Sequence, residues 1–168
     1  IRVNSMHCNR NDYSALLTQH KIKHQLIEHL PEAIALEQPS AVNHLPNFES
    51  GWVSVQDTAA QAAVELLPVP KSGRLLDACC APGGKLSHLI NRYPHVNVMG
   101  TDISQERLDR VKTDSKRLGI KPTLKAANIH KPSEWFDGHL FDAILLDGPC
   151  SGTGVISRNP DIKLLRRP

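Results

Sequence analysis

Apolar residues between positions 73 and 146 follow two alternating patterns. Short aliphatic and β-branched runs predict four strands, at 75–78, 96–101, 122–127 and 141–146. Between them, apolar residues at helical spacing predict one helix at 85–91 and another between a Ser104 cap and Gly119. Strands that alternate with helices form a mostly parallel sheet with right-handed crossovers. The pattern therefore predicts the α/β class and a Rossmann-like fold.

The first 50 residues show shorter and less regular patterns. Asp12 is expected to cap a helix over residues 13–20. Extended stretches are expected at 25–30, 33–36 and 41–45, separated by prolines. A segment of this length cannot form a large core alone. We therefore expect a small α/β subdomain over 1–50 and a larger α/β domain over 51–168.

A short region connects these two parts. Residues 51–55 predict a strand, and Asp57 can cap a helix that continues to about Leu67 and ends before Pro68. The buried side of this helix is expected to consist of Ala59, Ala60, Ala63, Val64, Leu66 and Leu67.

The composition excludes some function classes. With 40% hydrophobic and 22% charged residues, the chain resembles an ordinary soluble domain. No apolar run approaches the roughly 20 residues of a membrane span, and the first residues do not form a secretory signal. The four cysteines form no Cys-x-x-Cys pair, so we expect no metal site and a reducing, cytoplasmic location.

Charge is distributed unevenly. Residues 51–168 carry a net charge of +4, and the densest basic stretch contains Arg158, Lys163, Arg166 and Arg167. Such a stretch suits a phosphate backbone, but it is equally compatible with a solvated surface.

The first of two candidate loops follows the first predicted strand. It reads Asp-Ala-Cys-Cys-Ala-Pro-Gly-Gly-Lys over 77–85. Its two glycines allow a ligand to approach the backbone, and the following helix offers free N–H groups to a carboxylate. Asp102 ends the next strand, 18 residues after Gly84, where an acidic residue typically binds ribose hydroxyls. These features predict a nucleotide-like cofactor at the strand ends. The glycine patterns typical of dehydrogenases and of NTPases are absent from the sequence.

The second candidate loop follows the fourth predicted strand. It reads Asp-Gly-Pro-Cys-Ser-Gly-Thr-Gly over 147–154 and brings the Cys150 thiol to the same edge of the sheet. A small buried cysteine is the alternative interpretation. The flanking proline and glycines favour a functional thiol.

Both loops, Asp102, the segment 51–61 and the run 145–163 together resemble the Sun (Fmu, or RsmB-like) family of RNA cytosine-C5 methyltransferases. The resemblance covers nearly the whole chain. It implies S-adenosylmethionine as cofactor, RNA as substrate, and 16S ribosomal RNA in particular. It also implies a methyltransferase fold with four of the usual seven core strands present. The oligomeric state is left open.

The resemblance also assigns residues to the cofactor pocket. Asp102 would bind the ribose, Asn128 would lie on the adenine side, and Asp147 would lie between cofactor and target base. Asn128 stands where an aspartate is usual, but its amide can still hydrogen-bond to an adenine amino group. The pocket-lining loop would consist of Cys79, Cys80, Ala81, Pro82, Gly83, Gly84 and Lys85.

The family chemistry implies roles for Cys150 and Asp147 as catalytic residues. A thiolate adds to carbon 6 of cytosine, and carbon 5 then attacks the sulfonium methyl. In the family, the attacking cysteine belongs to a later Thr-Cys motif, the Pro-Cys thiol (here Cys150) helps to release the product, and Asp147 holds the base. The sequence contains no Thr-Cys pair. We therefore expect the chain alone to bind cofactor weakly or not at all and to transfer no methyl group.

Two alternatives remain open. DNA cytosine methyltransferases use a Pro-Cys thiol as nucleophile, so Cys150 could attack directly, although the segment 154–161 fits the RNA family better. The chain could also be a non-catalytic RNA-binding module that kept the fold. Because it lacks an initiator Met and stops 18 residues after Cys150, we expect a piece of a longer protein whose 141–146 strand forms an exposed apolar edge.

Overall fold

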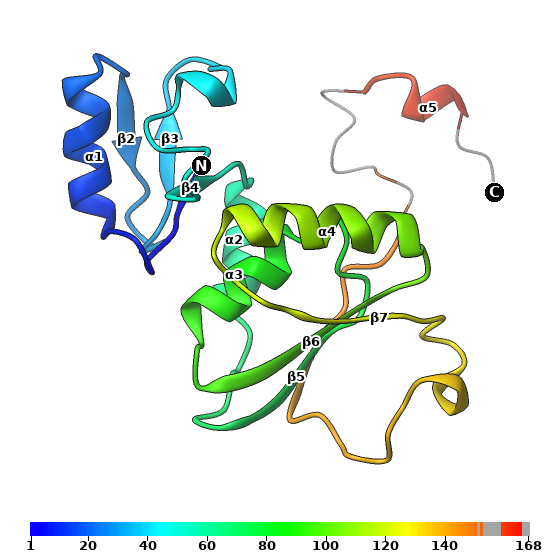
Figure 1. Ribbon diagram of the computed structural model, residues 1–168. Helices are drawn as coiled ribbons and strands as arrows, with labels where there is room; N and C mark the ends of the chain where they lie inside the picture. The colour runs from blue at the N-terminus through cyan, green and yellow to red at the C-terminus, as the bar shows by residue number, and fades with distance from the viewer. Residues whose placement is uncertain (151, 153–158, 166–168) are drawn as a thin grey trace.

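The computed structural model describes residues 1–150, 152 and 159–165. Its centre is a four-stranded parallel sheet in the order β7-β6-β5-β8 (Figure 1). The strands are β5 (Gly73–Asp77), β6 (Val96–Asp102), β7 (Thr123–Ala126) and β8 (Ala143–Leu145). The predicted α/β class and Rossmann-like fold are confirmed, and all four strands lie within or near their predicted ranges.

Three helices cover one face of this sheet: α2 (Thr58–Glu65), α3 (Gly84–Arg92) and α4 (Gln105–Arg117). Alternation along β5 directs Leu75 toward these helices and Leu76 toward the other face. The helix-covered core is the larger one and contains the buried residues Val64, Leu75, Leu86, Leu89, Val98, Leu108, Val111, Ala143 and Leu145. Packing on this face holds the carboxyl ends of the strands in place.

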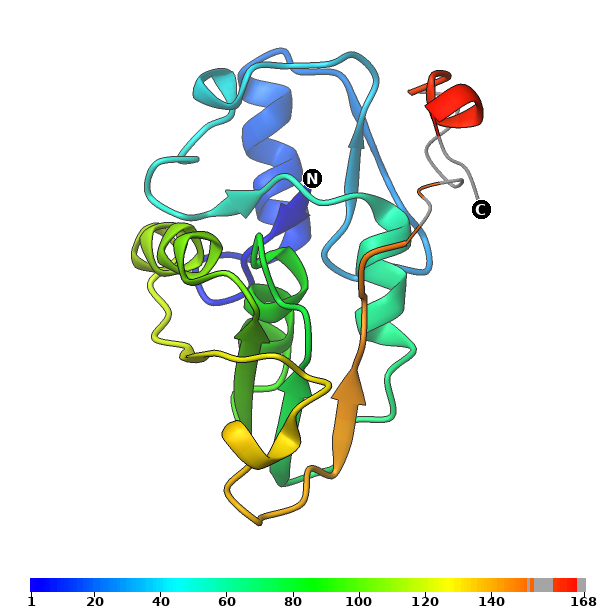
Figure 2. The same cartoon turned by 90° about the vertical axis from the view of Figure 1, so that its right-hand side faces the viewer.

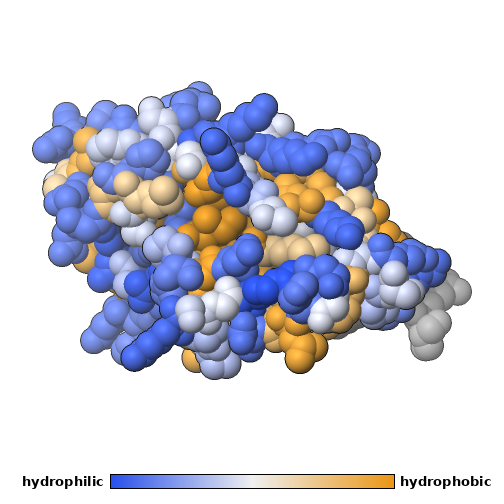
Figure 3. Space-filling model, turned by 60° about the horizontal axis from the view of Figure 1, so that its bottom comes forward, coloured by the Kyte–Doolittle hydropathy of each residue, from blue (hydrophilic) through white to orange (hydrophobic). Residues whose placement is uncertain are grey.

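The opposite face has a thinner cover. Leu76 packs with Trp135, which follows the short 3₁₀ helix η2 (Pro132–Glu134). On and after β8, Ile144 and Leu146 are 55% and 61% exposed, and within the described residues β8 pairs only with β5. Figure 3 shows several apolar areas on a largely hydrophilic surface.

Side chains cap two of the helices at the predicted positions. The Asp57 carboxylate accepts a hydrogen bond from the Ala59 N–H at 3.0 Å, and the Ser104 hydroxyl accepts one from the Arg107 N–H at 3.3 Å. Helix α4 is followed by Gly119 in a left-handed conformation (φ 74°), which glycine adopts readily, and the helix ends where the sequence predicts.

The N-terminal unit consists of α1 (Arg10–Gln19), a hairpin of β2 (His24–Leu26) and β3 (Ile34–Leu36), and a second antiparallel pair. That pair joins β1 (Arg2–Val3) to β4 (Val53–Ser54). Figure 2 shows this unit beside the helices of the larger domain. Because β4 lies beyond residue 50 yet completes a sheet with β1, the connecting region packs with both units. The boundary between 50 and 51 stays a prediction.

Three sequence-based expectations about these helical segments are wrong. Asn9, rather than Asp12, caps α1, because its side-chain oxygen accepts the Asp12 N–H at 2.9 Å. Residues 41–45 are not extended but contain the 3₁₀ helix η1 (Val42–His44), because the His44 and Leu45 N–H groups donate to the carbonyls three residues earlier, at 3.0 and 3.1 Å. Helix α2 ends at Glu65, which leaves Leu66 82% exposed rather than buried, and Ala59 in its first turn is exposed as well, because the buried side of α2 contains Gln61 and Val64.

Polar contacts join the N-terminal unit to helix α3. The Arg2 guanidinium donates to the Ser87 hydroxyl at 2.9 Å, and Ser87 donates to the Gly84 carbonyl at 3.0 Å in the first turn of α3. Asn91 donates to the side chain of Asn4 at 3.0 Å. The N-terminal unit thus contacts the helix that begins at the candidate cofactor loop.

Candidate active site

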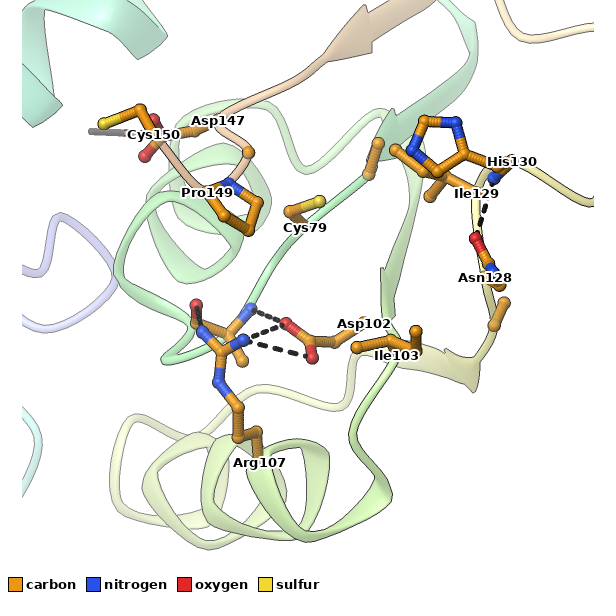
Figure 4. A pocket seen from close by; sticks show the side chains of 14 residues that line it. Cys79, Asp102, Ile103, Arg107, Asn128, Ile129, His130, Asp147, Pro149 and Cys150 are labelled. Carbon is orange, nitrogen blue, oxygen red and sulfur yellow. Dashed lines mark hydrogen bonds and ion pairs between the residues drawn. The ribbon is translucent and has the colours of Figure 1, made fainter. Parts of the chain in front are cut away.

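The carboxyl ends of β5, β6, β7 and β8 meet around a cavity of about 640 Å³ (Figure 4). Strand β5 lies between β6 and β8, so the chain order reverses beside it, which is where open parallel sheets bind ligands. The volume is within the usual range of roughly 300–1,000 Å³ for ligand pockets. Figure 4 shows Asp102 with Arg107, Asn128 with His130, and Asp147 with Cys150 on different sides of this cavity.

Asp102 ends β6 and is almost completely buried. Its carboxylate accepts hydrogen bonds from the Ser104 N–H at 3.0 Å and the Ala81 N–H at 3.4 Å. The Arg107 guanidinium lies 3.1 Å from one Asp102 oxygen and also donates to the Ala81 carbonyl at 2.7 Å. The predicted ribose-binding residue is therefore rigidly held against the cofactor loop.

The sequence analysis missed Arg107. Arg107 stands in the first turn of α4, where the helix dipole favours acidic rather than basic residues. A cation at that position, five residues after a strand-ending carboxylate, is the signal that could have indicated it.

The loop over 77–85 is fixed by backbone hydrogen bonds. The Cys80 N–H donates to the Thr101 carbonyl at 2.8 Å, and the Gly83 N–H donates to the Cys80 carbonyl at 2.7 Å. Gly83 has a φ of 101°, and a Cβ there would lie 3.1 Å from a methyl group of Val111. Glycine is thus required at this position, which precedes the first residue of α3.

The two adjacent cysteines of the loop have different surroundings. Cys80 packs in the helix-covered core, and burial raises the pKa of its thiol to about 12. Cys79 is only partly buried and lines the cavity, and burial also raises the pKa of its thiol. Neither environment stabilises a thiolate.

A second, smaller cavity of about 220 Å³ adjoins the first and shares Cys79, Ala81 and Asp147 with it. Here Lys85 and Asp147 form an ion pair. Asp77 is 1% exposed, and burial raises the pKa of its carboxyl to about 7, opposed by the nearby Lys85 and reinforced by Asp147. Asp77 therefore lies at the boundary between its charged and neutral forms near neutral pH.

The remaining candidates line the larger cavity. Asn128 is partly buried, and its side-chain oxygen accepts the His130 N–H at 3.0 Å. Cys150 is exposed, and its sulfur accepts the Gly152 N–H at 3.3 Å. Every predicted site residue except Gly83 therefore lines one of the two cavities.

Other predicted features lie partly outside the described residues. Arg158, Arg166 and Arg167 of the basic stretch are among these, as is most of the run 151–158. Within the described part of the chain, no group of three or more His, Cys, Asp or Glu side chains could hold a metal ion. No helix there is both long and apolar enough to cross a membrane.

Comparisons with known proteins decide the family. The family model of the 16S rRNA methyltransferase RsmB/F matches residues 63–168, and the ferredoxin-like domain of RsmF/B-like methyltransferases matches residues 1–43. This chain belongs to the RsmB/F methyltransferase family. The resemblance inferred from the two loops is thereby confirmed.

The most similar relatives include the ribosomal RNA small subunit methyltransferase B of Yersinia pseudotuberculosis. It is 46% identical over 167 residues, which cover 99% of this chain and 39% of that protein. The chain thus spans about two fifths of the length of the curated relatives it matches.

Two solved structures of longer proteins share the fold. The crystal structure of PH0851 has a TM-score of 0.86 at 28% identity and covers 99% of this chain and 38% of its own. A methyltransferase homologue from Pyrococcus horikoshii has a TM-score of 0.79 at 28% identity, and the match covers 97% of this chain and 54% of that one. These likenesses agree with the Rossmann-like sheet described above.

Proposed function

We propose that this chain supplies the S-adenosylmethionine site of a cytoplasmic enzyme that methylates carbon 5 of cytosine in RNA of the small ribosomal subunit. The observation that carries this proposal is the convergence of both loops and Asp102 on two adjoining cavities in a member of the RsmB/F family. The Yersinia relative bears the name of a small-subunit ribosomal RNA methyltransferase.

The residues present fit the cofactor. The buried Asp102 carboxylate has further lone pairs with which to accept ribose hydroxyls, and Ile103 and Ile129 offer apolar contacts to the adenine. One Asp77 oxygen is buried without a hydrogen-bond partner among the described residues. A buried unpaired carboxylate oxygen is costly, and the cofactor's α-ammonium group would satisfy it. When bound, the cofactor supplies an electrophilic methyl group.

The protein's own groups then position the base. The Lys85 ammonium holds the Asp147 carboxylate, which in turn accepts hydrogen bonds from the amino edge of the target cytosine. Cys150 lies at the exposed rim of the same cavity, three residues from Asp147. In the family reaction a thiolate adds to carbon 6, carbon 5 takes the methyl group, and loss of the carbon 5 proton expels the thiol. We assign Cys150 to this last, product-releasing stage.

A chimera tests the proposal in a complete enzyme. Residues 1–168 replace the aligned 39% of the Yersinia relative, and the chimera is supplied with labelled S-adenosylmethionine and unmodified small-subunit RNA. We expect 5-methylcytosine in the RNA, detected by mass spectrometry, and none when Asp102→Ala is present. Methylation at another base atom, or none by a folded chimera, would contradict the proposal.

The same chimera separates the two roles of Cys150. If Cys150 releases the product, Cys150→Ala leaves a covalent RNA adduct that accumulates on a denaturing gel. If Cys150 is itself the nucleophile, the variant forms no adduct. If the chimera and its Cys150→Ala variant bind the RNA equally well and neither methylates it, a non-catalytic RNA-binding module is favoured.

A further inference from the structure

Gln56 is a buried amide with no assigned role. It lies between β4 and α2, is 8% exposed, and neither its side-chain nitrogen nor its side-chain oxygen has a hydrogen-bond partner among the described residues. Leaving a buried donor and acceptor unpaired costs free energy unless water or a ligand pairs them, and Gln56 borders a cavity that could hold one. The position itself is well defined, because the Gln56 carbonyl accepts the Gln61 side chain at 3.1 Å.

Gln56 lines the small cavity, together with Asp77, Lys85 and Asp147. Asp77 also has a buried oxygen without a partner among the described residues. The two groups reach the cavity from different parts of the fold: Asp77 ends the central strand, and Gln56 follows the strand that pairs with the N-terminal unit. Two independent polar groups, each without a partner among the described residues, thus border one cavity.

We propose that Gln56 binds the amino-acid end of S-adenosylmethionine, donating to its α-carboxylate and accepting from its α-ammonium group. This inference rests on the proposed function and assigns a binding role to a residue outside the candidate loops. An amide has both a donor and an acceptor, so it matches a zwitterion, whereas Asp77 can match only the ammonium group. Lys85 adds a positive charge for the carboxylate.

The order of residues along the two cavities supports this placement. Asn128 and Asp102, assigned to adenine and ribose, line only the larger cavity, and Cys79 and Ala81 line both. Gln56 and Asp77 line only the smaller one. A cofactor with its adenosine in the larger cavity therefore extends its amino-acid end past the loop toward Gln56. The target base is expected near Cys150, which lines the larger cavity alone.

Two ligands separate this role from a general effect on the pocket. S-adenosylhomocysteine carries the amino-acid end, whereas 5′-methylthioadenosine lacks it. Calorimetric titration of the chimera described above is expected to show that Gln56→Ala weakens S-adenosylhomocysteine binding about 10- to 100-fold, the range for a hydrogen bond to a charged group. Binding of 5′-methylthioadenosine is expected to change less than about twofold. Gln25→Ala, on the exposed strand β2, serves as the matched control and should leave both affinities unchanged.

Gln56→Met provides a second measurement that a folding defect cannot imitate. Methionine fills a similar volume without unpaired polar atoms, so the ligand-free variant should melt at a higher temperature while S-adenosylhomocysteine binding still weakens. Unchanged S-adenosylhomocysteine affinity in both Gln56 variants would overturn this inference. An equal loss of affinity for S-adenosylhomocysteine and 5′-methylthioadenosine would also overturn it. Either result would leave the proposed cofactor site standing. If a folded chimera without these substitutions binds neither ligand, the proposed cofactor site and this inference both fail.

Discussion

Two clusters of polar side chains in this protein, each with buried charged members, differ in what surrounds them. The interface cluster, Arg2, Glu32, Glu65 and His88, lies where the N-terminal unit meets α2 and α3. The cavity cluster, Asp77, Lys85, Asp102 and Asp147, lies at the carboxyl edge of the sheet. Both clusters contain groups that are expensive to bury. They differ in what compensates that cost.

The interface cluster is closed by other protein groups. Glu32 lies 3.7 Å from Arg2 and 3.5 Å from His88, and His88 lies 3.5 Å from Glu65. Burial, reinforced by Arg2 and Arg92, lowers the pKa of His88 to about 3, so the ring is neutral at pH 7 and these contacts are not ion pairs of His88. Burial raises the pKa of Glu32, and Arg2 opposes that shift. The positive charges that match the carboxylates here are those of Arg2, which pairs with Glu32, and of Arg92, which lies 3.3 Å from Glu65.

The cavity cluster is not balanced internally. It contains three carboxylates and one lysine, with Arg107 beside Asp102, and it opens onto a space large enough for a ligand. Burial is the main cause of the raised pKa of Asp77; Lys85 opposes the shift, and the neighbouring carboxylates of Asp147 and Asp102 add to it. The comparison teaches that buried charge closed by protein partners supports the fold, whereas buried charge facing a cavity marks a binding site.

The largest expected effect comes from breaking the interface cluster. Arg2→Ala should lower the free energy of unfolding by about 3–5 kcal/mol, because it leaves a buried carboxylate without its partner. Urea denaturation of the chain measures this. The control is Arg110→Ala, whose side chain is 75% exposed and pairs with Glu106 on the surface, and which should change stability by less than about 1 kcal/mol. If Arg2→Ala and Arg110→Ala lower the free energy of unfolding equally, the interface cluster does not support the fold more than a surface ion pair does.

The second effect concerns pH and the cavity cluster. The folded-state pKa of Asp77 is raised from 3.8 to about 7, so its contribution to stability is fully present below pH 3.8 and is lost as the pH rises to about 7. Stability of the unmodified chain relative to Asp77→Asn should therefore fall across this window, by up to about 4 kcal/mol. The pKa of His88 is lowered from 6.5 to about 3, so its contribution to stability rises with pH instead of falling. His88 is present in both proteins, so its contribution cancels when the stability of Asp77→Asn is subtracted from that of the unmodified chain. A difference that does not change with pH would contradict the raised pKa.

The third effect tests whether the cavity cluster acts on ligand more than on fold. Asp102→Asn keeps the side-chain shape but removes the charge that pairs with Arg107 and that we propose accepts ribose hydroxyls. We expect S-adenosylhomocysteine affinity to fall about 100-fold, with a smaller loss of unfolding free energy. The exposed Asp109→Asn is the matched control. If the free energy of unfolding falls by more than the free energy of ligand binding, Asp102 supports the fold, like the interface cluster, rather than the ligand.

The smallest effect concerns thiol chemistry at the cavity. Cys150 is exposed, whereas Cys80 is buried with a raised pKa, so a disulfide reagent should modify Cys150 first and Cys80 last. S-adenosylhomocysteine should slow modification of Cys79 but not of Cys8, which lies in the N-terminal unit. Mass spectrometry after timed quenching gives the order. Protection of Cys8 and Cys79 to the same extent would indicate a global change rather than a bound ligand.

Local sequence patterns determined much of this protein. Aliphatic and β-branched runs located the four parallel strands, and apolar residues at helical spacing located helices α3 and α4. Asp57 and Ser104 correctly indicated the caps of α2 and α4, because a cap depends on neighbours only a few residues away. The two loops identified the family without any structure, since each motif is contiguous.

Only the tertiary structure decided which distant residues meet. Arg2 reaches Ser87, Arg107 joins Asp102 to Ala81, and Gln56 enters a cavity with Asp77, although none of these contacts leaves a local pattern. For the same reason Leu66, apolar and next to a helix, was wrongly expected to be buried. Local propensity and periodicity act over one or two turns of chain, whereas burial and charge compensation depend on what packs opposite, and that is decided only when the whole fold has formed.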